Sequence, residues 1–132
     1  MSNEKGKGLR YNEGKLRFDL FPPFARRIIA QIFTKGAEKY ALRNWENGMP
    51  WSSVEASLER HYQSYKESKD FDPEDGMLHI AKVAWNAIAL TEYYKIYPQG
   101  DDRPHRYLLQ NKIGLDIDEV LADFVGALMD RF

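Results

Sequence analysis

The sequence predicts an all-α helical bundle, followed by a short strand and helix at the C-terminal end. Two segments, residues 23–34 and 52–69, place apolar side chains at helical spacing. A third, residues 72–94, opens with turn residues and then runs apolar for about six turns. The connection between the last two segments is short, which predicts antiparallel neighbouring helices.

Size and composition limit the functions to consider. The chain has 132 residues, enough for one core-bearing domain, and a formal net charge of −1. Such a balance gives no broad basic field for a nucleic acid polymer. The absence of cysteine removes disulfides and thiolate metal sites and suits an intracellular, cytoplasmic protein. No signal-peptide pattern or membrane-spanning run is present in the sequence, so we expect no membrane partner.

The first segments are an arm and an extended stretch. Residues 1–14 combine glycine and charge without any period, which predicts a flexible N-terminal arm. In the stretch that follows, Lys15 and Arg17 alternate with apolar residues and therefore lie on one side. They belong either to a solvated strand or to an arm that brings cations to phosphates.

Helix 23–34 begins at a Pro-Pro pair, which suits a helix start, and we expect Gly36 to end or bend it. A short helical turn over residues 37–41 then carries Glu38. The loop that follows contains Trp45 and Trp51, both of which either plug the core or line a ligand site.

Helix 52–69 starts with the sequence Ser-Ser-Val-Glu, which predicts a capping box from Ser52 to Glu55. The inward-facing stripe of this helix includes His61, and Glu59 flanks it. A single histidine on a buried face is usually a hydrogen-bonded core residue, so His61 alone carries no functional assignment.

One polar line interrupts the apolar run of residues 72–94. Asp75, His79, Lys82 and Asn86 are spaced i, i+4, i+7 and i+11, which places them on a single face of a helix. Such a line is either a hydrogen-bonded network or subunit contact, or a reactive stripe facing a pocket or metal. Because the two helices are antiparallel, we expect His61 to approach His79.

The C-terminal part changes character. Residues 98–111 form a linker rich in proline, glycine and charge. Residues 112–132 then predict a buried strand and an amphipathic helix, which is the start of an α/β unit without its partner strand.

Four motifs together resemble a known family. They are KLRFDLFPP, GAEKY-x3-NW-x2-GMPW, the ERH of helix 52–69, and DPEDG-x2-H-x6-N. The combination resembles the phage-type dATP/dGTP diphosphohydrolase N-terminal domain, a branch of the MazG-like all-α nucleoside triphosphate pyrophosphohydrolases. The resemblance defines a domain over residues 15–97. It implies an oligomeric helical bundle that cleaves nucleoside triphosphates with Mg²⁺ or Mn²⁺ held by acids on neighbouring helices.

The usual acidic signature of that superfamily is altered here. The position of its E-x-x-D motif reads His79-x-x-Lys82, and the acids crowd the preceding turn. Carboxylate oxygens suit Mg²⁺. The metal candidates are therefore Glu38, Glu59, Asp72, Glu74 and Asp75.

Other roles follow from the chemistry of the side chains. Histidine titrates near neutral pH, so His61 and His79 are the candidates for proton transfer. Cations suit phosphates, tryptophans suit base stacking, and asparagines suit a base edge. The substrate-binding candidates are Lys15, Arg17, Asn44, Trp45, Trp51, Lys82 and Asn86.

The tail resembles a second family. GLDIDEVLADF is similar to the first motif of haloacid dehalogenase-like 5′-nucleotidases, in which Asp116 would be the nucleophile and Asp118 the acid/base. Later motifs of that family are missing from this sequence. We therefore expect an incomplete, degenerate stub without phosphatase activity.

The resulting prediction is a metal-dependent hydrolase acting on purine deoxynucleoside triphosphates, dATP and dGTP, and releasing the monophosphate and pyrophosphate. We expect a homo-oligomer, dimer or tetramer, because the third helix is apolar on several sides. The alternative is a non-catalytic nucleotide-binding or oligomerisation module of a fused nucleotidase.

Overall fold

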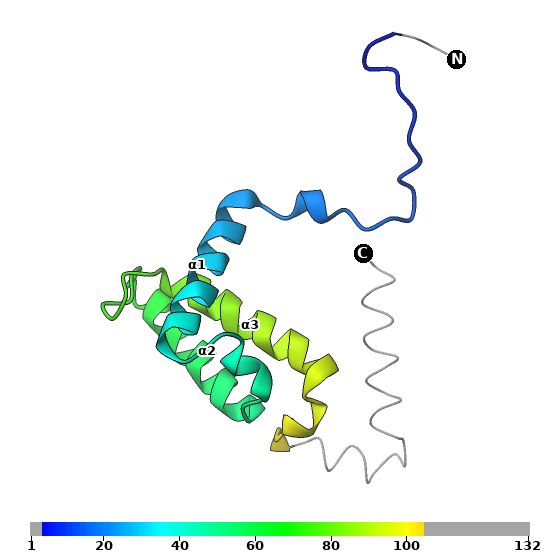
Figure 1. The fold of residues 1–132 in the computed structure, drawn as a ribbon. Helices are drawn as coiled ribbons and strands as arrows, with labels where there is room; N and C mark the ends of the chain where they lie inside the picture. The colour runs from blue at the N-terminus through cyan, green and yellow to red at the C-terminus, as the bar shows by residue number, and fades with distance from the viewer. Residues whose placement is uncertain (1–3, 105–132) are drawn as a thin grey trace.

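The computed structural model describes residues 4–104 and confirms the all-α class (Figure 1). Its helices are α1 (Pro23–Lys39), α2 (Trp51–Lys66) and α3 (His79–Ile96). Short 3-10 turns cover Phe18–Leu20, Asn44–Asn47 and Pro98–Gly100. The predicted strand and helix of residues 112–132, with Asp116 and Asp118, lie outside the described residues. In the part of the chain that the structure describes, no helix is long and apolar enough to span a membrane.

Helices α2 and α3 are antiparallel neighbours, as predicted. Trp51 at the start of α2 packs against Tyr94 near the end of α3, with ring centroids 4.8 Å apart. At the other end of the pair, His61 meets His79. α1 crosses this pair and packs mainly against α3, while the N-terminal arm extends away from the helices (Figure 1).

Helix α1 begins at Pro23, as the Pro-Pro pair predicts, but it is longer than expected. It runs through Gly36 without a break and ends at Lys39, where the Tyr40 N–H donates to the Gly36 carbonyl. The expectation that the helix ends at Gly36 is therefore wrong. Glycine lowers helix stability by only about 1 kcal/mol, which neighbouring contacts readily offset.

Helix α2 begins one residue earlier than predicted, with Pro50 at its N-cap and no side-chain cap. The predicted capping box is wrong, because Ser52 already lies inside the helix. Its backbone N–H donates instead to the Asp102 carboxylate at 2.9 Å. A distant residue thus satisfies a donor that the first turn leaves unpaired.

Helix α3 begins at His79, so the preceding residues form a turn and not the first helical turns. The Asp72 N–H donates to the Met77 carbonyl, and the His79 N–H donates to the Asp70 carbonyl. Gly76, at φ 74°, takes the left-handed conformation that this tight reversal requires. Asp75 therefore lies on a turn, but its carboxylate still faces the helical stripe through Lys82.

The core is small and aromatic. Trp51, Val54, Ala89 and Tyr93 are buried together, and the Tyr93 hydroxyl donates to the Trp45 carbonyl at 2.6 Å. The Trp51 indole N–H donates to the Tyr97 carbonyl at 3.0 Å. Trp51 is thus a core residue, which is the first of the two alternatives left open for the tryptophans of this loop.

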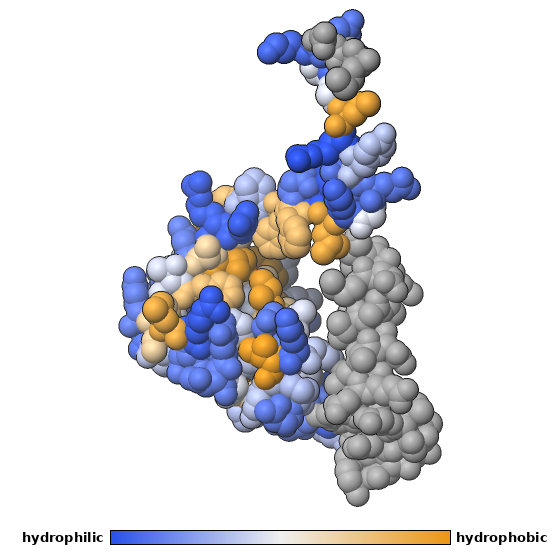
Figure 2. Space-filling model, turned by 45° about the vertical axis from the view of Figure 1, so that its right-hand side comes forward, coloured by the Kyte–Doolittle hydropathy of each residue, from blue (hydrophilic) through white to orange (hydrophobic). Residues whose placement is uncertain are grey.

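Several large apolar side chains remain exposed. Phe24 of α1 is 71% exposed, and Phe18, Leu20 and Phe21 beside it are exposed too. Figure 2 shows apolar side chains gathered where the arm joins the helical body. On α3, Ile80 is 41% exposed, so this apolar helix is not covered on every side by the described chain.

Candidate functional site

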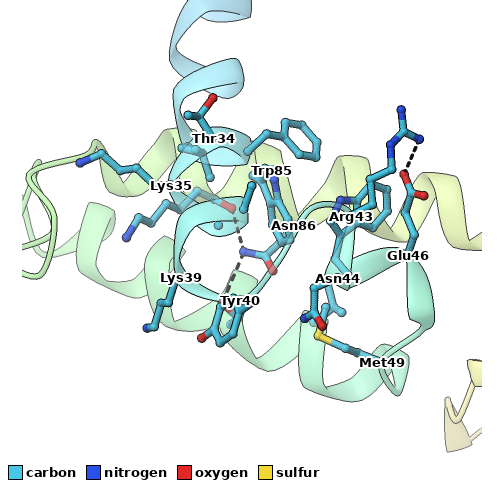
Figure 3. A pocket seen from close by; sticks show the side chains of 18 of the residues that line it. Thr34, Lys35, Lys39, Tyr40, Arg43, Asn44, Glu46, Met49, Trp85 and Asn86 are labelled. Atoms are coloured by element: carbon cyan, nitrogen blue, oxygen red, sulfur yellow. Dashed lines mark hydrogen bonds and ion pairs between the residues drawn. The ribbon is translucent and has the colours of Figure 1, made fainter.

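A cavity of about 880 Å³ opens between the end of α1, the turn Asn44–Asn47, and the facing sides of α2 and α3 (Figure 3). Aromatic, amide, cationic and imidazole side chains all reach it. The lining residues that determine its chemistry are Phe33, Lys35, Lys39, Arg43, Asn44, Trp45, Ser57, His61, Glu74, Asp75, Lys82, Trp85 and Asn86.

Three aromatic rings from three elements form one wall of the cavity. Phe33 lies 5.9 Å from Trp45 and 5.6 Å from Trp85, measured between ring centroids. The two indoles are 6.1 Å apart in an edge-to-face arrangement. The Trp85 indole N–H is buried and has no hydrogen-bond partner among the described residues. An orphaned buried donor beside a cavity is one that a ligand or an ordered water can satisfy.

Asn86 supplies a fixed amide in the middle of the cavity (Figure 3). Its Nδ2 donates to the Lys82 carbonyl at 2.8 Å and to the Ser57 hydroxyl at 3.4 Å. Both donor positions are therefore used within the protein. Its amide oxygen accepts no hydrogen bond from any residue that the structure describes, which leaves it to accept one from a ligand.

Cations line the rim. Lys35 donates to the Asp75 carbonyl at 2.9 Å, and Lys39 pairs with Glu74 at 3.1 Å. Arg43 pairs with Glu46 at 3.2 Å. The Lys39 and Arg43 side chains are largely exposed, so their ion pairs are weak and can yield to a ligand anion.

At the His61 side of the cavity, three side chains of types that can ligate a metal ion converge. The Nδ1 atoms of His61 and His79 are 2.9 Å apart, so one ring donates a hydrogen bond to the other. An oxygen of Asp72 completes the group, and the three ligand atoms lie within 4.8 Å of one another. We call these residues the His-Asp-His trio. His79 and Asp72 are buried behind the cavity wall, whereas His61 lines it.

Lys82 lies beside the trio and is held by two carboxylates. Its ammonium is 2.7 Å from Asp72 and 2.7 Å from Asp75. Burial lowers the pKa of Lys82, but the bonds to the two carboxylates outweigh burial, and the net shift is upward. The hydrogen bond from Lys82 likewise lowers the pKa of Asp72. All three groups are charged at neutral pH, and together they carry one excess negative charge.

His61 is adapted to stay neutral. Burial lowers its pKa, and the positive charge of Lys82 lowers it further. A neutral imidazole can accept a proton or bind a metal ion through its unprotonated nitrogen. The trio therefore fits a divalent ion such as Mn²⁺ that accepts nitrogen ligands, whereas Mg²⁺ prefers oxygen.

The structure distributes the predicted site residues unevenly. Seven line one cavity: Asn44, Trp45, His61, Glu74, Asp75, Lys82 and Asn86. His79 and Asp72 adjoin it through the trio. Glu38 and Glu59 are exposed and do not line the cavity, and Lys15 and Arg17 lie on the arm, where Arg17 pairs with Asp19.

Sequence reasoning missed the cations of the rim. Lys35 and Lys39 lie beyond the expected end of the first helix, so their common face was not considered. They are four residues apart, and an uninterrupted helix places such residues on one side. The signal was present in the sequence and was hidden by the assumption that Gly36 ends the helix.

The chain matches one known protein family. Residues 5–103 match the family described as dATP/dGTP diphosphohydrolase, N-terminal. A dATP/dGTP diphosphohydrolase of Salmonella phage PMBT28 is 27% identical over 96 residues, which are 73% of this chain and 33% of that protein. The chain therefore spans about a third of the relative's length. No solved structure matches it.

Proposed function

Because the chain belongs to the dATP/dGTP diphosphohydrolase N-terminal family, we propose that it hydrolyses purine deoxynucleoside triphosphates in a metal-dependent reaction. The products are the monophosphate and pyrophosphate. The observation that carries the proposal is a single cavity that joins an aromatic wall, a cationic rim and the His-Asp-His trio. Its volume of about 880 Å³ lies within the range of small-ligand sites.

The aromatic wall suits the base. Trp45 and Trp85 present indole faces and edges, and stacking on a base contributes about 1–3 kcal/mol per ring. The free amide oxygen of Asn86 can accept a hydrogen bond from an amino group of adenine or guanine. The unpartnered Trp85 N–H can donate to a ring nitrogen or a sugar oxygen.

The rim suits the phosphates. Lys35, Lys39 and Arg43 bring three cations to the rim, and phosphate oxygens can replace the carboxylates that pair with Lys39 and Arg43. The Asp72, Asp75 and Lys82 group, in contrast, repels phosphate through its excess negative charge. A divalent ion held beside Asp72 would change that excess to one positive charge, which is a physical reason for metal dependence.

His61 and His79 are proposed to act together on the attacking water, by holding the ion that activates it. His61 faces the cavity, and its Nδ1 lies 2.9 Å from Nδ1 of His79. The bound ion would supply charge neutralisation and a more acidic water. The water oxygen would then bond to the α-phosphorus and give up its proton to solvent, while the bond to the pyrophosphate oxygen breaks. Lys35 and Lys39 would stabilise the charge of the departing pyrophosphate.

A binding module without turnover is the second candidate. Lys82 occupies the carboxylates that a catalytic metal would use, which favours nucleotide binding without cleavage. Incubating the full chain with each of the four dNTPs and Mn²⁺, and measuring pyrophosphate, separates the two. We expect pyrophosphate to be released from dATP and dGTP, and we expect EDTA to abolish this release. A raised melting temperature with dGTP and no pyrophosphate would leave only the binding module.

A further inference from the structure

The spacing of the trio matches the coordination of one metal ion. Two nitrogens each about 2.1 Å from an ion and at right angles to one another lie about 3 Å apart. The Nδ1 atoms of His61 and His79 are 2.9 Å apart. Two ligand atoms on opposite sides of an ion lie about 4.2 Å apart on the same basis. The ligand atoms of the trio lie within 4.8 Å of one another, so Asp72 needs to move inward only slightly.

The hydrogen bond between the rings does not prevent binding. One Nδ1 carries a proton in the metal-free state. That proton can leave Nδ1 while Nε2 of the same ring takes one from solvent, which keeps the imidazole neutral and frees both Nδ1 lone pairs. Asp72 accepts bonds from Lys82 and from the Glu74 N–H, and these contacts orient its carboxylate.

The donor set selects the class of ion. Two imidazoles and one carboxylate suit Mn²⁺, Co²⁺ or Zn²⁺, whereas Mg²⁺ takes oxygen ligands and retains its waters. Two further acids of the turn are already paired with cations: Asp75 with Lys82, and Glu74 with Lys39.

We propose that the His-Asp-His trio binds one divalent transition-metal ion per chain, and that Lys82 is a built-in second cation of the same centre. Its ammonium lies between Asp72 and Asp75, where a second divalent ion would otherwise bind these oxygens. The inference deepens the proposed function and depends on it only for the role of the ion. Metal binding can be tested without any nucleotide.

The test is a titration of the metal-free full chain with Co²⁺, followed by calorimetry and by the visible absorption of the bound ion. We expect about one equivalent, with millimolar Mg²⁺ unable to displace it. His61→Gln should weaken binding by more than about 100-fold, beyond the loss usual for an outer-shell contact. The exposed Glu55→Gln on the same helix is the matched control and should bind normally.

Lys82→Met tests the second cation. Removing the ammonium leaves Asp72 and Asp75 unpaired, so this variant should take up a second equivalent of Co²⁺ and bind Mg²⁺.

The proposal is overturned if the wild-type chain binds no saturable equivalent, if His61→Gln binds as tightly as wild type, or if Mg²⁺ displaces Co²⁺ at similar concentrations. One equivalent in Lys82→Met, folded by circular dichroism, refutes the role of Lys82. If Lys82→Met does not fold, the Lys82→Arg chain, which keeps the charge, must still bind one equivalent. Metal binding without pyrophosphate release would contradict the proposed function alone.

Discussion

His61, a residue with a neutral, partly buried ring, makes stability depend on pH. Because its pKa in the folded chain lies below the ordinary 6.5, the unfolded chain takes up a proton first as the pH falls. We therefore expect the metal-free protein to lose stability as the pH drops below about 6.5. The His61→Gln variant should lose less stability over the same pH range, as measured by urea denaturation at several pH values. Equal pH slopes for the two proteins would rule out this role.

Asp72 and Glu74 are two acids of one turn with opposite environments. Asp72 is 9% exposed and bonds to Lys82, so Asp72→Asn should lower stability by about 2 kcal/mol. The Glu74 side chain is 68% exposed, so its ion pair with Lys39 is screened by solvent and contributes little. Glu74→Gln is thus the matched control in urea denaturation. A larger loss from Glu74→Gln would reverse this assignment of the two acids.

At the residue scale, sequence reasoning located part of the site. The polar stripe and the antiparallel helices together predicted that His61 meets His79. The pairing of Lys82 with Asp75 depends on the turn around Gly76, whose path follows from backbone hydrogen bonds that no periodicity reveals. The contact of Ser52 with Asp102, fifty residues away, is likewise tertiary.

At the scale of elements, two glycines have opposite roles. Gly48 has a φ of 99°, and a Cβ there would lie 2.9 Å from the Tyr97 ring. Gly48→Ala should therefore lower stability by about 2 kcal/mol and shift the turn that carries Asn44 and Trp45. Gly36 lies inside α1, and a Cβ there meets nothing within 4 Å. Gly36→Ala should raise stability by about 0.5–1 kcal/mol.

Thermal and urea denaturation measure the change in stability in both glycine variants. A loss of stability in Gly36→Ala would mean that α1 does not continue through residue 36 as described.

The same comparison shows why element boundaries were harder to predict than element types. Glycine was given its usual role as a helix terminator, whereas its place in α1 is decided by the packing of this helix on α3.

At the scale of the whole molecule, the exposed face of α3 supports the predicted homo-oligomer. Ile80, Ala84 and Ala87 are exposed at helical spacing on an otherwise apolar helix. We expect a dimer or tetramer by light scattering at micromolar concentration. Ala84→Glu should dissociate it, because a carboxylate would be buried in the contact. Ala56→Glu, on an exposed site of α2, should not. A wild-type monomer would contradict the prediction.

The central claim is that His61 and His79 act as one unit at the phosphate end of the cavity. The most direct measurement is the rate of pyrophosphate release from dGTP by His61→Gln, His79→Gln and the double variant. Groups that act together fail together, so we expect each single variant to lose roughly 100- to 10,000-fold and the double variant to lose little more. Each protein must retain the circular dichroism spectrum of the wild type. Modest losses that multiply in the double variant would return both histidines to a structural role and contradict the account.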